Sequence, residues 1–135
     1  MRARDRLGRF VDPGDPAAVP PVHPDPLPPD QAVRLARDLL AEGRAFAAHE
    51  VFESSWKAAD AGERDLWQGL AQVCVGLTHL QRGNPVGSVT LLRRGAERLA
   101  GAADVHGLHP ARTAKDATDL AARVAAGANE GWLDV

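Results

Sequence analysis

The sequence has little of what marks several common protein classes. It contains one cysteine, three tryptophans, three phenylalanines and no tyrosine. A lone cysteine, Cys74, cannot form an internal disulfide, and its place in the apolar run from Leu70 to Leu77 favours an inert core thiol. No run is long and apolar enough to span a bilayer, and the arginine-rich N-terminus lacks the apolar stretch of a secretory signal. We therefore expect a cytoplasmic protein.

An excess of charge of one sign is also missing. The 135 residues carry a formal net charge of −2, and the 16 lysines and arginines are scattered rather than clustered. Nucleic acid and membrane surfaces are therefore not expected partners. Hydrophobic residues make up 44% of the chain and charged residues 25%. This composition is ordinary for a soluble protein, and the length suits one domain with one core.

Proline is concentrated in one segment. Eight of the ten prolines precede residue 30. Because proline lacks a backbone N–H and disfavours helix in the residue before it, this composition predicts an extended arm. We expect the arm over residues 1–29, either disordered or laid across a helical domain over residues 30–135. Its one distinctive sequence is Arg4-Asp5-Arg6-Leu7-Gly8-Arg9.

The rest of the chain is typical of helices. Apolar residues recur at helical spacing, and glycine and proline separate the periodic segments. The pattern predicts helices over roughly 28–42, 45–59, 63–82, 85–102 and 110–126. Gly83-Asn84-Pro85 is the clearest boundary, with a helix stop, an N-cap and a first helical residue. No alternation typical of strands appears. The expected fold is therefore all-α, a compact bundle of four to five antiparallel helices arranged as stacked hairpins.

The second predicted helix places ionisable and aromatic side chains on the same broad face. Burying an ionisable side chain costs several kcal/mol unless it is paired or binds something. His49 and Glu53 are four residues apart and can hydrogen-bond to each other. Two glutamines share one face of the third helix, which is the expected neighbour. The candidate functional cluster is therefore His49, Glu50, Glu53, Trp56, Gln68 and Gln72.

Three interpretations of this cluster remain open. In the first, the His49–Glu53 pair is structural, the glutamines Gln68 and Gln72 satisfy its spare lone pairs, and the protein is a small binding or scaffolding module. Its partner would be an unknown protein or a small-molecule ligand, and no cofactor is expected. In the second, His49 and Glu53 bind a divalent metal, although the zinc-protease motif would need a second histidine where Glu53 stands. In the third, a desolvated Glu53 with a raised pKa acts beside His49 in hydrolase-like acid–base chemistry.

Three further histidines lie in predicted loops. These are His23, His106 and His109, and we expect them to be solvated. The last two are close enough in sequence to share an adventitious metal.

The motif residues resemble the DUF309 family of small helical proteins. The matching segments are Gly43-Arg-Ala-Phe46-Ala-Ala-His49-Glu50-Val-Phe-Glu53-Ser-Ser-Trp56, Trp67-Gln68-Gly69-Leu70-Ala-Gln72 and His79-Leu-Gln-Arg-Gly83-Asn84. The resemblance as a whole covers roughly residues 30–100. The resemblance implies an all-α bundle that could form a homodimer. The family has no assigned function, so the resemblance supports the importance of the cluster without giving its role. Cys74-Val-Gly76 has less bulk than the usual aliphatic run, which predicts space near a helix crossing.

Overall fold

The computed structural model describes residues 3–21 and 25–135. Met1, Arg2 and residues 22–24, which include the predicted loop residue His23, lie outside the described residues. The helices are α1 (Pro29–Ala41), α2 (Ala45–Ala58), α3 (Arg64–Gln81), α4 (Pro85–Leu99) and α5 (Pro110–Ala125), with a short 3₁₀ helix (Ala61–Glu63) before α3. These bounds confirm the predicted all-α bundle.

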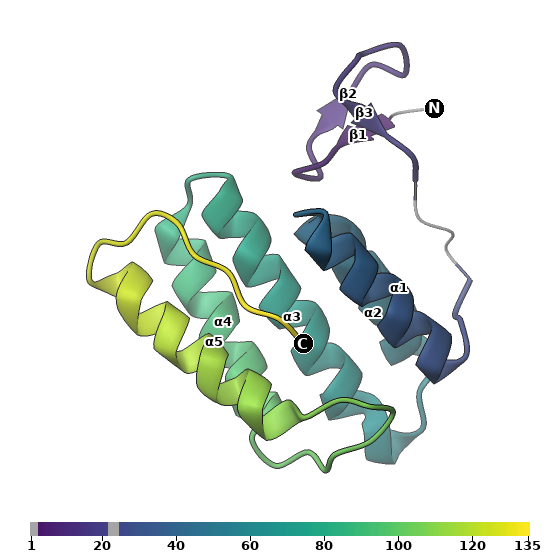
Figure 1. The fold of residues 1–135 in the computed structure, drawn as a ribbon, viewed down its shortest axis with the longest axis vertical. Coiled ribbons are helices and arrows are strands. Elements are labelled where there is room, and N and C mark those ends of the chain that lie inside the picture. Colours follow the sequence, from purple (N-terminus) through teal and green to yellow (C-terminus); the bar gives the residue numbers. More distant parts are fainter. Residues whose placement is uncertain (1–2, 22–24) are drawn as a thin grey trace.

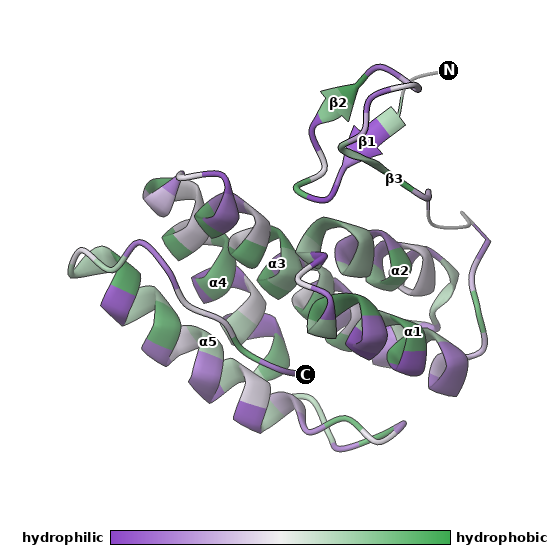
Figure 2. Cartoon of the chain, turned by 45° about the horizontal axis from the view of Figure 1, so that its top comes forward, coloured by the Kyte–Doolittle hydropathy of each residue, from purple (hydrophilic) through white to green (hydrophobic). Residues whose placement is uncertain are grey.

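The helices pack in the order of the sequence, each against the next (Figure 1). The middle helix, α3, lies between α2 and α4, and its side chains Leu70, Val73 and Leu77 are fully buried. In Figure 2, α3 is mostly green, whereas the outer helices α1 and α5 also carry hydrophilic residues. Cys74 is fully buried on α3, and burial raises the pKa of its thiol well above the usual range. Such a thiol is unreactive, as expected.

The hairpin turns are those that the sequence predicts. Gly43 and Gly83 have φ angles of +75° and +76°, a backbone conformation that glycine adopts without strain. The side-chain oxygen of Asn84 caps α4 by accepting a hydrogen bond from the Gly87 N–H at 3.1 Å. The two turns are joined because Gln81 Nε2 donates to the Gly43 carbonyl oxygen at 2.8 Å.

Helices α3 and α4 cross closely because glycines lie at the crossing. A Cβ atom added at Gly76 would lie 2.8 Å from Leu92 Cγ. One added at Gly95 would lie 2.8 Å from the carbonyl oxygen of Gly69. The space predicted near Gly76 is therefore filled by Leu92 from α4.

The arm differs from the prediction, because it forms a small sheet. Strands β1 (Ala3–Asp5), β2 (Phe10–Val11) and β3 (Ala18–Val19) make an antiparallel sheet in the order β2-β1-β3. Two aspartates stabilise the turns that connect these strands. Asp5 Oδ1 accepts hydrogen bonds from the N–H groups of Leu7 and Arg9, both at 2.9 Å. Asp15 Oδ1 accepts one from the Ala17 N–H at 2.8 Å. Strands of two or three residues are too short to show an alternating pattern, so the expectation of no strand was wrong here.

The arm sheet lies over the end of the bundle that holds the α1–α2 turn (Figure 1). Three arginines join arm and body by donating to backbone carbonyl oxygens. Arg6 donates to Glu42, Arg44 to Pro20 at 2.9 Å, and Arg82 to Leu7 at 2.8 Å. Gly8, with a φ angle of +79°, lies against the ring of Phe46, where an added Cβ would come within 2.3 Å of Cγ. The arm is therefore laid across the domain.

Residues 127–135, called the tail below, return across the bundle after α5 (Figure 1). Leu133 is 7% exposed, and Trp132 beside it is partly buried against the core. Both residues therefore hold the tail, and Leu133 is the more deeply buried. Among the described helices, none combines the length and the apolarity needed to cross a bilayer.

Candidate functional site

The predicted pair on α2 forms. His49 Nε2 lies 2.8 Å from Glu53 Oε2, and Lys57 Nζ lies 3.0 Å from Glu53 Oε1. The His49 ring also packs against Phe46, with 5.3 Å between ring centroids. These contacts follow from the helical spacing of three and four residues. They fix the imidazole between an aromatic ring and a carboxylate.

The pKa directions on α2 differ from the one that the acid–base interpretation expects at Glu53. Burial lowers the pKa of His49, and the Glu53 carboxylate offsets this only in part. The pKa of Glu53 is lowered, chiefly by the hydrogen bond from Lys57. The acid–base interpretation expected a raised pKa at Glu53, and that expectation was wrong. The carboxyl group with the raised pKa is Glu50, and burial is the main cause.

The glutamines of α3 do not complete the expected network. Gln68 and Gln72 are half-buried, but among the residues that the structure describes neither hydrogen-bonds to His49 or Glu53. Gln72 Oε1 and His49 Nδ1 are both buried without a hydrogen-bond partner in the described part of the chain. In the described part of the chain, no hydrogen bond therefore joins these glutamines to the His49–Glu53 pair.

Trp56, the remaining predicted residue, lies at the other end of α2. It is partly buried against the core, and its ring centroid lies 5.7 Å from the guanidinium carbon of Arg64. This contact places it at the start of α3, away from the arm. Trp56 therefore packs where α2 meets the start of α3.

Within the described ranges, no group of three His, Cys, Asp or Glu side chains converges to hold a metal. His49 and Glu53 supply two adjacent ligand atoms, and structural zinc sites use four. The metal interpretation of this pair stays a prediction.

A cavity of about 750 Å³ lies between the arm and α2. We call it the arm pocket, and its walls are Ala3, Arg4, Asp5, Arg6, Pro13, Ala18, Val19, Pro20, Pro21, Arg44, Phe46, Ala47 and Glu50. Of the predicted cluster, Glu50 is the member that lines it. The candidate site therefore shifts from the His49–Glu53 pair to the face beside it.

Arginine and phenylalanine are stacked at this pocket. The guanidinium carbon of Arg4 lies 4.0 Å from the ring centroid of Phe10 and 4.7 Å from that of Phe46. Arg4 Nη1 also donates to the Gly8 carbonyl oxygen at 2.6 Å. Stacking between two rings and a hydrogen bond together fix the position of this cation.

The walls of the arm pocket carry more positively charged than negatively charged side chains. Burial alone would raise the pKa of Asp5, but hydrogen bonds and charge from Arg9, with the Leu7 N–H, hold it below its ordinary value. Asp5 is thus paired within the arm, with Arg9 Nε 2.8 Å from Oδ2. Of the other lining groups, Arg44 Nη1 lies 4.0 Å from Glu42 Oε2 outside the pocket, and Arg4 and Arg6 share the lining with one further carboxyl group, Glu50. The lining therefore holds three arginines and two carboxyl groups, an excess of one positive charge, whereas the whole chain carries −2.

The arm residues were the part that sequence reasoning missed. The sequence shows Arg4-Asp5-Arg6-Leu7-Gly8-Arg9 as distinctive but does not indicate its role. The local signal was present, because an aspartate three residues before a glycine is typical of a tight turn. The contact of Arg4 with Phe46 could not be predicted from the sequence, because it joins positions far apart in the chain.

A second polar group was also missed. His106 Nε2 lies 2.9 Å from Glu63 Oε1, and Trp67 Nε1 donates to the same oxygen at 3.1 Å. The rings of Trp67 and His106 stack, with centroids 5.7 Å apart. His106 was expected to be solvated, and this was wrong. His109 contacts a different partner, Asp104, at 3.1 Å.

Comparison with known proteins finds one family that part of the chain matches. The family model described as "Domain of unknown function (DUF309)" matches residues 33–91, which contain all six residues of the predicted cluster. No curated protein and no solved structure gives a significant match to the chain. Residues 33–91 are therefore similar to the DUF309 family, which the motif around His49 and Glu53 led us to expect.

Proposed function

We propose that this protein is a binding module, and that the arm pocket takes a small organic anion with an apolar part. One observation carries the proposal. Three arginines and Phe46 enclose a cavity of about 750 Å³ around a half-buried Glu50. This volume lies within the range of small-molecule sites, which are mostly apolar with a few placed polar groups.

The charge of the walls supports an anion. Arg4 and Arg6 each donate to a backbone carbonyl oxygen, and a guanidinium group has five N–H donors. Further donors therefore remain for a carboxylate or sulfonate, for which arginine is well suited. Glu50 opposes them with one negative charge.

The apolar walls support a ligand with a hydrocarbon part. Val19, Pro20 and Pro21 from the arm face the side of α2 that carries Phe46 and Ala47. A fully polar ion would leave these surfaces against water, whereas an apolar chain would cover them. We therefore favour an amphipathic anion over inorganic phosphate.

In this proposal the His49–Glu53 pair is a positioning element. It packs against Phe46 through the His49 ring at 5.3 Å, and Phe46 in turn supports both Arg4 and Gly8. The pair would fix the floor of the pocket without touching the ligand.

The test is an NMR titration of the ¹⁵N-labelled full-length protein with 1-hexanesulfonate, which stays ionised at all pH values used. We expect shifts of the amides of Phe46, Ala47, Val19 and Glu50, and none with hexylammonium at the same concentration. Shifts elsewhere, or equal shifts with both probes, would overturn the proposal.

The variant Glu50→Gln sharpens the test. It removes a negative charge from the pocket, so 1-hexanesulfonate should bind about threefold tighter. Glu97→Gln removes the same charge from the exposed side of α4 and serves as the control. Equal affinities of the two variants would contradict a ligand site beside Glu50.

A further inference from the structure

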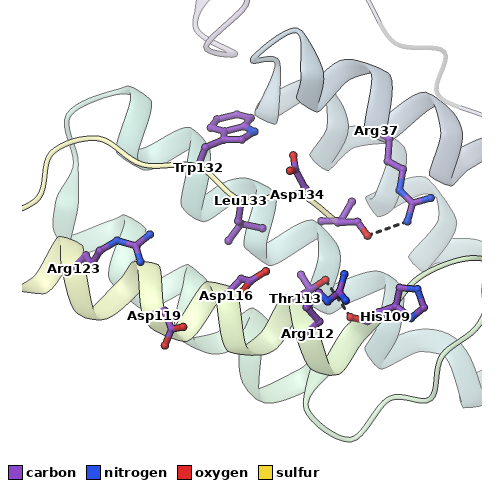
Figure 3. Close-up of a pocket in the computed structure, with 11 residues that line it drawn as sticks. Arg37, His109, Arg112, Thr113, Asp116, Asp119, Arg123, Trp132, Leu133 and Asp134 are labelled. Atoms are coloured by element: carbon purple, nitrogen blue, oxygen red, sulfur yellow. Dashed lines mark hydrogen bonds between the residues drawn. The ribbon is translucent and has the colours of Figure 1, made fainter.

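We propose that the tail and α5 form a second site, which binds an extended peptide as a strand added to the tail. A cavity of about 540 Å³, called the tail slot, lies between them (Figure 3). Its walls are Arg37, His109, Arg112, Thr113, Asp116, Asp119, Arg123 and Trp132 to Val135. It shares no residue with the arm pocket, so the two proposals are independent.

The tail is extended and anchored at its middle and its end. Figure 3 shows Leu133 pointing toward the helices, with Trp132 and Asp134 on the other side, the alternation that is typical of a strand. Midway along the tail, a Cβ added at Gly131 would lie 2.5 Å from Leu120 Cδ1. At its end, Arg37 Nη2 donates to the Val135 carbonyl oxygen at 3.1 Å. A strand held in this way needs little ordering when a partner binds.

The backbone of the tail is unpaired beyond its start. The Ala128 N–H donates to the Arg123 carbonyl oxygen at 3.0 Å. Beyond it, residues 129–134 make no backbone hydrogen bond to any part of the chain that the structure describes. An extended segment with free N–H and C=O groups is a template for a further strand.

A row of charges on α5 faces the same cavity. Arg112, Asp116, Asp119 and Arg123 are separated by four, three and four residues, which places them on one stripe of the helix. Asp119 pairs with Lys115 at 3.1 Å. Arg112, Asp116 and Arg123 have no ion-pair partner among the described residues.

The spacing of this row predicts the peptide pattern. Four residues of helix rise about 6 Å, and alternate residues of a strand are about 6.6 Å apart. Arg112 and Arg123 lie a helical rise of about 16.5 Å apart, and three alternate residues of a strand span about 13 Å, a difference that long glutamate and arginine side chains can bridge. The complementary order is acidic, basic, acidic at alternate positions, opposite Arg112, the two aspartates and Arg123.

The test uses the full-length protein and synthetic peptides in isothermal titration calorimetry. The probe is acetyl-Glu-Val-Lys-Val-Glu-amide, and the control is acetyl-Lys-Val-Glu-Val-Lys-amide. We expect the probe to bind about tenfold tighter, because three exposed ion pairs form with the probe and like charges meet with the control. Equal affinities, or no heat with the probe at millimolar concentration, would overturn the proposal.

Two further measurements separate this site from nonspecific charge attraction. The double variant Arg112→Glu, Arg123→Glu should reverse the preference between the peptides, with circular dichroism showing that it is folded. Two modified probes test strand pairing. The first is N-methylated at both valines and lacks the N–H groups of one strand edge. The second is N-methylated at its charged residues and lacks those of the other edge. Loss of binding by one of them supports strand addition, and unchanged binding of both refutes it.

Discussion

At the scale of single residues, His49 is the group whose protonation the fold resists. Burial lowers the pKa of its imidazole below the ordinary value of 6.5, and the charge of Arg4 acts in the same direction. The unfolded chain therefore binds a proton more readily than the folded one. The free energy of unfolding must fall as the pH drops through 6.5 toward the folded pKa.

The variant His49→Gln should remove this dependence. We expect the urea midpoint of the natural chain to drop between pH 7.5 and pH 5.5 by more than that of His49→Gln. His109→Gln changes a more exposed histidine and is the matched control. If all three proteins lose stability equally, His49 does not resist protonation as described.

Residue contacts were predictable where they are local. The His49–Glu53 hydrogen bond follows from a spacing of four on a helix. The contact of His106 with Glu63 spans 43 residues, and its loop reaches α3 through a turn in which His106 has a φ angle of +55°. A single sequence does not indicate which residues so far apart in the chain come into contact. The stacking of Arg4 on Phe46 could not be predicted for the same reason, because these residues are also far apart in the chain.

At the scale of elements, the arm depends on one glycine. Alanine at Gly8 would need a positive φ and would place its Cβ within 2.3 Å of the Phe46 ring. Gly8→Ala should therefore detach the arm while the helices stay folded. Amide hydrogen exchange of residues 3–19 should rise strongly, and that of α3 should not change. Gly14→Ala, with no atom within 4 Å of the added Cβ, should leave both unchanged.

The α3–α4 crossing is the second element-scale test. A Cβ at Gly95 would meet the Gly69 carbonyl oxygen at 2.8 Å and the Val73 nitrogen at 3.0 Å, and backbone cannot move aside cheaply. We expect Gly95→Ala to lower the free energy of unfolding by about 1–3 kcal/mol. Gly101→Ala, which meets nothing within 4 Å, should change it little. Similar urea midpoints for both variants would mean that the crossing is looser than described.

Helices were predictable as elements, and the arm strands were not. Periodic apolar residues, Asn84 at an N-cap and glycines at the turns define α1 to α5 within a few residues. The strands of the arm have two or three residues each, and they exist because Asp5 and Asp15 stabilise tight turns between them. Turn hydrogen bonds, rather than hydrophobic alternation, therefore determine that sheet.

At the scale of the whole molecule, the net charge is −2, but the charged residues are distributed unevenly over the fold. Arginines gather where the arm meets α2, and they form both the attachments of the arm and the walls of the arm pocket. The expectation of no polyanion partner rests on average composition and stays a prediction, and average composition carries no information about where the arginines gather in the fold. The suggested homodimer stays a prediction.

In the function proposed above, the arm and α2 together form one ligand site. Calorimetric titration of 1-hexanesulfonate into the natural chain and into Gly8→Ala tests it most directly. We predict binding with one site per chain in the natural protein and loss of binding in Gly8→Ala, with the helical circular dichroism of both unchanged. Equal binding by both proteins, or none by the natural chain, would contradict the account.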